Sequence, residues 1–213
     1  MLQRLIWVSQ ALDLIKTLSL NRRVNLLGVV GSLLLFYVAL SSRPWWTLVG
    51  GSSSERAFHV EFSPFAFDAE ALGKPLTIPV IPYLNLAARL SMLLAAFTTL
   101  AGSLLAFKTW SKPMLSTKGL LLPIIFMAGI FAASQAVKPL LGFGIPVYGE
   151  SLVKYSFILQ GMNVTAEIPL KSEVTVEYWI ALAAGVISAF AKIIHGRIPV
   201  KAPEAPESSE EWG

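Results

Sequence analysis

The sequence has no cysteine and few charged residues. Without cysteine, disulfides, thiolate metal sites and cysteine nucleophiles are all excluded. Only 14% of the 213 residues are Asp, Glu, Lys or Arg, whereas an ordinary soluble domain has about 25%. By contrast 54% are hydrophobic, and the mean hydropathy is +0.63. So few charges cannot cover a water-soluble globule of this size, which favours a lipid bilayer as the surroundings of the chain.

The sequence also lacks a concentrated patch of positive charge. It has 17 Lys and Arg against 13 Asp and Glu, a net charge of +4. A nucleic-acid-binding protein gathers its basic residues on one soluble face, whereas here they are spread between hydrophobic stretches. We therefore expect no nucleic-acid partner.

No recognisable catalytic motif is present. The chain lacks His-Glu-x-x-His, Gly-x-Ser-x-Gly and a phosphate-binding glycine loop. We expect no enzyme, no catalytic residue, no metal site and no bound cofactor. Its two histidines, His59 and His195, are predicted to lie on opposite sides of the membrane, so they cannot share a metal. Three nearby acids could bind a divalent cation, but a solvated acidic face is the simpler interpretation: Glu61, Asp68 and Glu70.

Four hydrophobic stretches are long enough to cross a bilayer. A span needs roughly 20 apolar residues, because each residue of a helix covers about 1.5 Å of a hydrocarbon core about 30 Å thick. None of the four contains an acidic residue; they cover residues 24–42, 83–107, 119–137 and 178–194. The sequence therefore predicts an all-α membrane protein, a four-transmembrane-helix bundle occupying residues 22–198.

The distribution of Lys and Arg predicts the orientation of this bundle. Most of these residues precede the first span, fill the short turn between the second and third, or follow the fourth. Because such residues collect on the cytoplasmic side, we place both termini in the cytoplasm of a multi-pass cell-membrane protein. The longer loops, 43–82 and 138–177, then lie outside. The second contains the sequon at Asn163, a candidate glycosylation site, although such short patterns often arise by chance.

The two ends of the chain differ from the bundle. Residues 1–21 place apolar and polar side chains on opposite faces of a helical wheel, which is typical of an amphipathic helix lying in the membrane interface. A signal peptide is the alternative, but the stretch has no small-residue cleavage site and keeps Asp13 and Lys16 in its middle. Residues 199–213 are rich in Pro, Glu and Ser, so a disordered cytoplasmic tail is predicted.

The outer loops have the pattern of short strands. Phe58, Val60 and Phe62 alternate with His59 and Glu61, the period of a half-buried strand. A hairpin is predicted around residues 160–161. Because an isolated hairpin is only marginally stable in water, we expect the loops to join in one small extracellular antiparallel β-sheet. Its predicted strands cover residues 45–49, 57–62, 76–81, 152–159 and 162–168.

Several residues within or beside the spans suggest roles. Arg89 lies about two turns inside the second span; because a buried charge is costly, we predict a structural clamp to the sheet or its carbonyl groups. The alternative is that Arg89 snorkels to the membrane surface. Four tryptophans lie near span ends and are predicted membrane anchors: Trp45, Trp46, Trp110 and Trp179.

Small and polar residues of the spans indicate helix contacts. Asn25 is a candidate for hydrogen bonds between helices, while small residues such as Gly28, Gly129 and Gly185 would let helices approach closely.

The order of these parts resembles the claudin-like four-transmembrane superfamily, which includes claudins, peripheral myelin proteins and calcium-channel gamma subunits. Trp45-Trp46 stands where that family's first outer loop begins, and the stretch from Ala87 to Met92 is similar to the start of its second helix. Residues 127–130 and 178–181 are similar to its third and fourth helices. The resemblance implies four spans, cytoplasmic termini and a β-rich first outer loop. The family's pair of loop cysteines is missing here, so the resemblance does not extend to junction function.

These observations lead to two hypotheses of different kinds. The first is a non-enzymatic membrane protein whose extracellular β-rich loops mediate contacts with like subunits or other membrane proteins. The alternative is a small accessory membrane subunit of a redox or transport complex that binds haem, quinone or an ion. A lipid-modifying membrane enzyme is a third reading, but the spans supply no recognisable acid, base or nucleophile.

Overall fold

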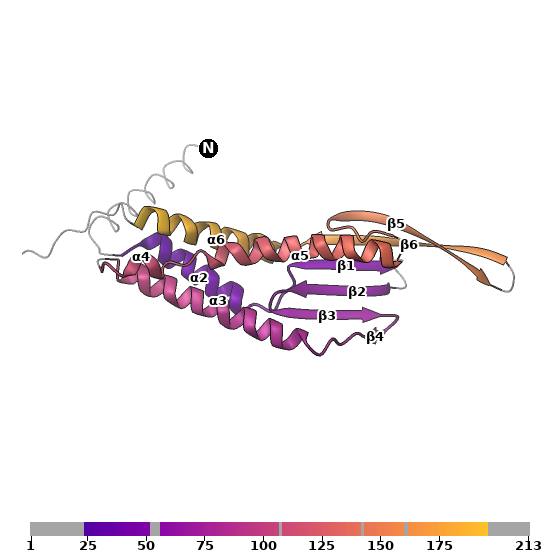
Figure 1. The fold of residues 1–213 in the computed structure, drawn as a ribbon, viewed down its shortest axis with the longest axis horizontal. Coiled ribbons are helices and arrows are strands. Elements are labelled where there is room, and N and C mark those ends of the chain that lie inside the picture. Colours follow the sequence, from indigo (N-terminus) through magenta and orange to yellow (C-terminus); the bar gives the residue numbers. More distant parts are fainter. Residues whose placement is uncertain (1–23, 52–55, 107, 142, 160–161, 196–213) are drawn as a thin grey trace, which may run out of the picture.

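The computed structural model describes residues 24–51, 56–106, 108–141, 143–159 and 162–195. The predicted interfacial helix, residues 1–21, and the predicted tail, residues 199–213, lie outside these described residues. In the part described, helices form one end of an elongated molecule and a β-sheet forms the other (Figure 1).

Three stretches are helical, long and apolar enough to cross a membrane. They are α3 (Ile81–Leu104), α6 (Val176–His195) and the stretch Ser111–Pro139, which combines α4 (Ser111–Met114) with most of α5 (Lys118–Leu141). A further apolar helix, α2 (Leu26–Leu40), has only 15 residues. Each predicted span thus corresponds to a helix, but α2 is shorter than the predicted first span.

Polar contacts join the helix ends that lie far from the sheet. The side-chain oxygen of Asn25 caps α2 by accepting a hydrogen bond from the backbone of Gly28. Its Nδ2 donates to the Ala191 carbonyl oxygen of α6 at 2.8 Å, and its backbone N–H donates to the Ser103 carbonyl oxygen of α3 at 2.8 Å. The predicted interhelical role of Asn25 is therefore confirmed.

The sheet has six antiparallel strands in the order β4-β3-β2-β1-β6-β5. The first loop contributes β1 (Trp46–Gly51), β2 (Arg56–Ser63), β3 (Ala66–Ala71) and β4 (Lys74–Pro75); the second contributes β5 (Gly149–Leu159) and β6 (Met162–Val174). Because β1 pairs with β2 on one side and with β6 on the other, both loops form a single sheet, as predicted.

The sheet differs from the prediction in the first loop. The strand predicted for residues 76–81 is wrong: residues 76–80 form no strand, and Ile81 begins α3, with Pro82 in its first turn, a position that proline favours. The missing strand is β3, which pairs with β2 through a tight turn. In that turn, the Ser63 hydroxyl accepts hydrogen bonds from the backbone N–H groups of Phe65 and Ala66.

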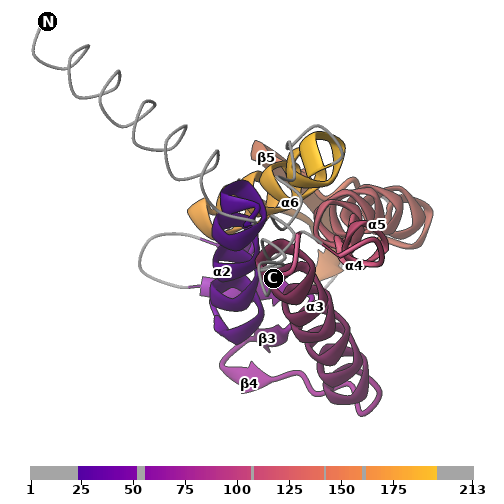
Figure 2. The same cartoon turned by 90° about the vertical axis from the view of Figure 1, so that its left-hand side faces the viewer.

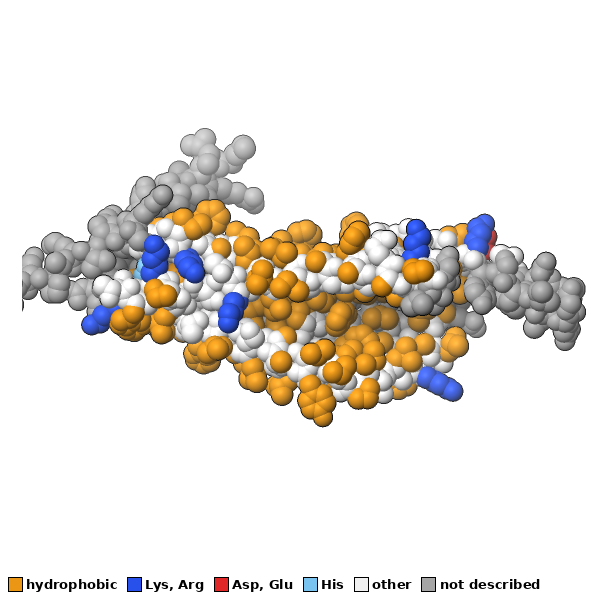
Figure 3. Space-filling model, viewed as in Figure 1, with side chains coloured by type: hydrophobic (Ala, Val, Ile, Leu, Met, Phe, Trp, Pro, Cys, Tyr) orange, Lys and Arg blue, Asp and Glu red, His pale blue; other side chains and the backbone are white. Residues whose placement is uncertain are grey.

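The hydrophobic core continues from the sheet into the helices. One face of the sheet, including Trp46 and Leu48, packs with Phe126 and Ile130 of α5. Between the sheet and the far end of the helices, many large apolar side chains are exposed. In Figure 3 these side chains cover α3 and α5, while Lys and Arg gather toward the two ends of the visible face. This banded surface, an apolar region with Lys and Arg toward its two ends, is the surface expected of helices that cross a lipid bilayer.

Candidate functional site

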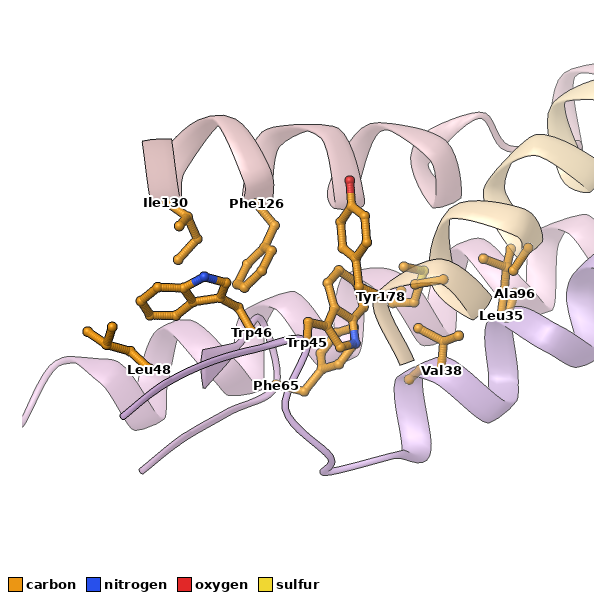
Figure 4. Close-up of a cluster of buried hydrophobic side chains, with 14 residues drawn as sticks. Leu35, Val38, Trp45, Trp46, Leu48, Phe65, Ala96, Phe126, Ile130 and Tyr178 are labelled. Carbon is orange, nitrogen blue, oxygen red and sulfur yellow. The ribbon is translucent and has the colours of Figure 1, made fainter. Parts of the chain in front are cut away.

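The junction between the sheet and the helices is built around Trp45. Its backbone is held on both sides: its N–H donates to the Phe62 carbonyl oxygen of β2, and its own carbonyl oxygen accepts from the N–H of Thr175, which follows β6, both at 3.0 Å. Its ring lies edge-on to Phe65 and Tyr178 at centroid distances of 5.5 and 6.1 Å. Figure 4 shows the ring enclosed by these side chains from the sheet and from α6. Trp45 therefore fixes the position of the sheet on the helix ends.

The adjacent Trp46 attaches the sheet to α5. Its ring lies beneath Ile130 of α5 and next to Leu48 (Figure 4), and its Nε1 donates to the Val147 carbonyl oxygen at 2.7 Å. Only 1% of Trp45 and 6% of Trp46 is exposed. Such rings have no face to offer to lipid headgroups, so the predicted anchor role is wrong for both: they are core residues beneath α5.

The other predicted anchors lie on the surface. Trp110 is 46% exposed in the turn before α4, and Trp179 is 58% exposed near the start of α6. An interfacial ring must be accessible to headgroups, and both meet this requirement. Their anchor role stays a prediction.

Arg89 of α3 reaches the sheet. Its Nη2 donates to the Phe65 carbonyl oxygen in the β2–β3 turn and to the Ser42 hydroxyl after α2, both at 3.2 Å. These are the contacts that the predicted clamp requires, since they join α3 to a carbonyl group of the sheet. How far they stabilise the fold stays a prediction, tested below.

A cavity of about 540 Å³ adjoins Arg89. It lies between the N-terminal half of α3, strand β3 and the segment that connects β4 to α3. Most of its lining is apolar, and its polar residues are Asp68, Thr77, Asn85 and Arg89. Neither hydrophobic pattern nor motif spacing indicated this cavity, because its walls come from a connecting segment predicted as a strand.

A second arginine lies at the same junction. Arg43 Nη1 donates to Glu177 Oε1 of α6 at 2.9 Å, although the Arg43 side chain is 74% exposed. This hydrogen bond and the negative charge of Glu177 raise the pKa of Arg43 above its usual value. Next to it, the Thr175 hydroxyl donates to the Pro44 carbonyl oxygen at 2.6 Å. These contacts join the residues that follow α2 to the start of α6.

The outward face of the sheet is polar. Glu61 lies opposite Asp68, and His59 lies opposite Glu70 on neighbouring strands. His59 Nε2 contacts Glu61 Oε1 at 3.1 Å. Among the described residues, no group of three or more His, Asp or Glu is placed to hold a metal ion. The arrangement thus fits the simpler interpretation of these acids, a solvated face.

His195 lies at the opposite end of the molecule, within a hydrogen-bonded network. The Asn25 side-chain oxygen accepts a hydrogen bond from the Gly28 N–H, which identifies the other atom of the amide as its nitrogen. This nitrogen lies 3.3 Å from His195 Nδ1. Because an amide nitrogen can only donate, Nδ1 accepts and the neutral ring carries its proton on Nε2. That proton points to Ser111 Oγ at 2.7 Å, and Ser111 donates to the Lys108 carbonyl oxygen at 2.6 Å. Both ring nitrogens are therefore used in packing α2, α4 and α6 together.

The candidate glycosylation residue, Asn163, lies in β6 opposite Ile158 of β5. This places it on the part of the hairpin farthest from the helices (Figure 1). Its modification stays a prediction.

Comparison with protein families finds no family that matches the sequence, and comparison with curated proteins finds no match either. The resemblance to the claudin-like superfamily therefore stays a prediction based on the residues named above.

Proposed function

We propose that this protein is a non-enzymatic, multi-pass cell-membrane protein whose extracellular sheet mediates contacts with further copies of itself or with other membrane proteins. In this arrangement α2, α3, α5 and α6 cross the bilayer, both termini are cytoplasmic, and the sheet lies outside. The banded surface of the helices supports this placement. So does the position of the short basic turn around α4, at the end away from the sheet (Figure 1) and facing the viewer in Figure 2.

The observation that carries the proposal is the length of the β5–β6 hairpin. Strand β6 pairs with β1 only from Leu170 to Val174. From Met162 to Pro169 its partner in the described sheet is β5 alone. The distal part of the hairpin, of which residues 152–159 and 162–169 are described, is thus a two-stranded ribbon that extends beyond the rest of the sheet (Figure 1).

Such a ribbon exposes unpaired backbone groups. A lone two-stranded hairpin is at best marginally stable in water, and an unpaired strand edge is a template for pairing with another chain. Pro169 begins the ribbon on β6, where it has no N–H to offer to a further strand within this sheet. Leu152 of β5 is a large apolar residue exposed at its base. Pro169 thus accounts for the end of the β1–β6 pairing, while the unpaired edges beyond it and the exposed Leu152 support a contact surface on the ribbon.

The register of the hairpin allows a precise test. Ser151 and Leu170 lie directly opposite each other, so residues 152–169 can be replaced by Asn-Gly, a dipeptide suited to a two-residue hairpin turn. The β1–β6 pairing is left intact. Because the deletion also removes the buried Val153, we expect this variant to fold with a somewhat lower melting temperature in detergent. It should lose co-purification of two differently tagged copies, or cross-linking to its membrane partners.

The matched control exchanges Lys154 and Glu167 for each other, which keeps the ion pair across the ribbon. This variant should assemble as the wild type does. A ribbon deletion that keeps wild-type mass in detergent and wild-type cross-links in native membranes would show that the contacts lie elsewhere.

The alternative, an accessory subunit that binds haem or another redox group, predicts a histidine with a ring nitrogen available to a ligand. His195 does not offer one, since Asn25 and Ser111 occupy both its nitrogens. His59 Nδ1 has no hydrogen-bond partner among the described residues, but it is buried. The visible absorption spectrum of the protein purified from its native membranes separates the two functions, because a Soret band would support the alternative and contradict the proposal above.

A further inference from the structure

We propose that the cavity beside Arg89 binds the phosphate of a phospholipid headgroup, with the acyl chains lying along the exposed face of α3. This inference depends on the membrane placement proposed above, but not on the role of the ribbon.

The first argument is the unbalanced charge of Arg89. Its two described hydrogen bonds use only Nη2, and both acceptors, the Phe65 carbonyl and the Ser42 hydroxyl, are neutral. Among the described ion pairs, none involves Arg89, whereas Arg43 at the same junction is paired with Glu177. A guanidinium group presents five donors in a planar fork that matches a phosphate. Arg89 therefore has donors and positive charge available for an anion.

The second argument is the size and lining of the cavity. Its volume of about 540 Å³ falls within the range typical of small-molecule sites, about 300–1,000 Å³. Phe65 and Phe67 line it from the sheet, and Ile78 and Pro79 line it from the connecting segment. Apolar walls lower the local dielectric and strengthen the attraction between a cation and an anion. An anion with an apolar part fits this lining better than a free inorganic ion.

The third argument is the apolar surface that continues from the cavity. Leu76 and Ile78 at its mouth, and Leu86 and Leu90 on α3, are all about half exposed. Water is a poor solvent for so much adjacent apolar surface, but acyl chains cover it readily. The cavity also lies where the helices meet the sheet, the level at which headgroups are expected. The ligand that satisfies both the charge and the apolar surface is a phospholipid.

The rim of the cavity refines the choice of headgroup. Asp68 is exposed on β3 and lines the cavity together with Arg89. A carboxylate there repels a second negative charge and attracts an amine. We therefore expect phosphatidylethanolamine, which carries both a phosphate and an amine, to bind at least as well as phosphatidylglycerol.

Native mass spectrometry of the full-length protein released from detergent tests the proposal. The probes are phosphatidylethanolamine, phosphatidylglycerol, diacylglycerol with the same acyl chains, and inorganic phosphate. Both phospholipids should remain bound, whereas diacylglycerol and inorganic phosphate should not. Binding of diacylglycerol equal to that of the phospholipids would overturn the role of the phosphate. Equal binding of inorganic phosphate would overturn the role of the acyl chains.

Two variants locate the binding in this cavity. Arg89→Gln should weaken phospholipid binding by at least about tenfold, because the charge-assisted hydrogen bonds to the phosphate are lost. Thr77→Trp should weaken binding comparably by filling the cavity from the connecting segment, while the contacts of Arg89 with Phe65 and Ser42 remain. This second variant keeps the test valid if Arg89→Gln fails to fold.

The matched control is Arg43→Gln, which removes an exposed arginine from the same junction but not from the cavity. It should bind phospholipid as the wild type does. Loss of binding in this control equal to the loss in Arg89→Gln would overturn the proposal, as would full binding by Thr77→Trp. Fractionation of the cells distinguishes a wrong membrane placement from a failure of lipid binding. If the placement is wrong, the protein will leave the membrane fraction without detergent.

Discussion

The ring of Trp45 meets the ring of Phe126 edge to face, with their centroids 5.3 Å apart. Trp45 lies between α2 and β1, whereas Phe126 lies in the middle of α5. This contact therefore joins the first loop directly to a helix on the other side of the molecule, and Phe62 of β2 contacts the same Phe126 ring at 5.3 Å. The sheet and the helices consequently share one core.

From this contact we expect Trp45→Ala to lower the free energy of unfolding by about 3–5 kcal/mol, the usual loss when a fully buried aromatic side chain is removed. Thermal unfolding in detergent measures the effect. Trp110→Ala is the control, since this tryptophan is about half exposed and its removal should change the melting temperature little. Equal losses for both variants would contradict the assignment of Trp45 to the core.

The clamp at Arg89 predicts a smaller loss. Arg89→Ala removes both hydrogen bonds to Phe65 and Ser42 and should lower the free energy of unfolding by about 1–2 kcal/mol. Arg43→Ala should cost less than Arg89→Ala, because the Arg43 side chain is 74% exposed and solvent screens its ion pair with Glu177. Thermal unfolding of the two variants in the same detergent compares them, and a loss for Arg43→Ala as large as that for Arg89→Ala would argue against a specific clamp.

Two glycines of neighbouring helices should respond oppositely to alanine. A Cβ atom at Gly185 of α6 would lie 2.5 Å from the Leu120 Cα atom and 2.6 Å from the Gly119 carbonyl oxygen of α5. Because backbone atoms cannot move aside cheaply, Gly185→Ala should force the helices apart and lower the free energy of unfolding by about 1–3 kcal/mol.

At Gly129 of α5, a Cβ atom would meet nothing within 4 Å. Gly129→Ala should leave stability unchanged or raise it by up to about 1 kcal/mol through better helix propensity. The predicted close helix contact is thus found at Gly185 but is wrong for Gly129, among the described residues. A marked loss of melting temperature in Gly129→Ala would reveal a contact at this surface, such as one with a second copy.

Leu72 offers a stabilising change. It occupies the turn between β3 and β4 with a φ of 51°, followed by Gly73 with a φ of 74°, and its side chain is 81% exposed. A left-handed conformation costs a bulky residue roughly 1–2 kcal/mol, and Asn-Gly is the preferred sequence for such a turn. Leu72→Asn should therefore raise the free energy of unfolding by about 1 kcal/mol.

The control for this change is Leu76→Asn, which also removes an exposed leucine but from a residue without a positive φ. Thermal unfolding should show a gain only for Leu72→Asn. If both variants gain equally, relief of exposed apolar surface rather than of backbone strain would be the cause.

The sequence predicted the elements that depend on local pattern. Long apolar runs located the helices, because few other structures bury so many consecutive apolar residues. The hairpin around residues 160–161 and the joining of both loops followed from alternation and from the instability of a lone hairpin. Strand β3, Ala66–Ala71, was missed because its alanines and acids have little strand propensity. It is held instead by pairing with β2.

The features of the candidate site were harder to predict because they depend on distances between remote segments. Trp45 and Trp46 stand where interfacial tryptophans often occur. They are buried by α5, which extends past the end of α2, and Trp45 is buried by Phe65 and Tyr178 as well. The contact of Asn25 with His195 brings together opposite ends of the described chain. The cavity beside Arg89 depends on how the segment after β4 turns into α3.

The pairing of β1 with β6 has a consequence for how the chain folds. Trp46 and Val174 are neighbours in the sheet, yet α3, α4 and α5 separate them in the sequence. Closing so long a loop carries an entropic penalty, and it slows folding. We expect β1, β2 and β3 to associate early during synthesis. The other edge of β1 stays unpaired until β6 has been synthesised. The seam between β1 and β6 is thus the last part of the sheet to form, and until then the nascent chain exposes the strand edge that a chaperone would need to shield.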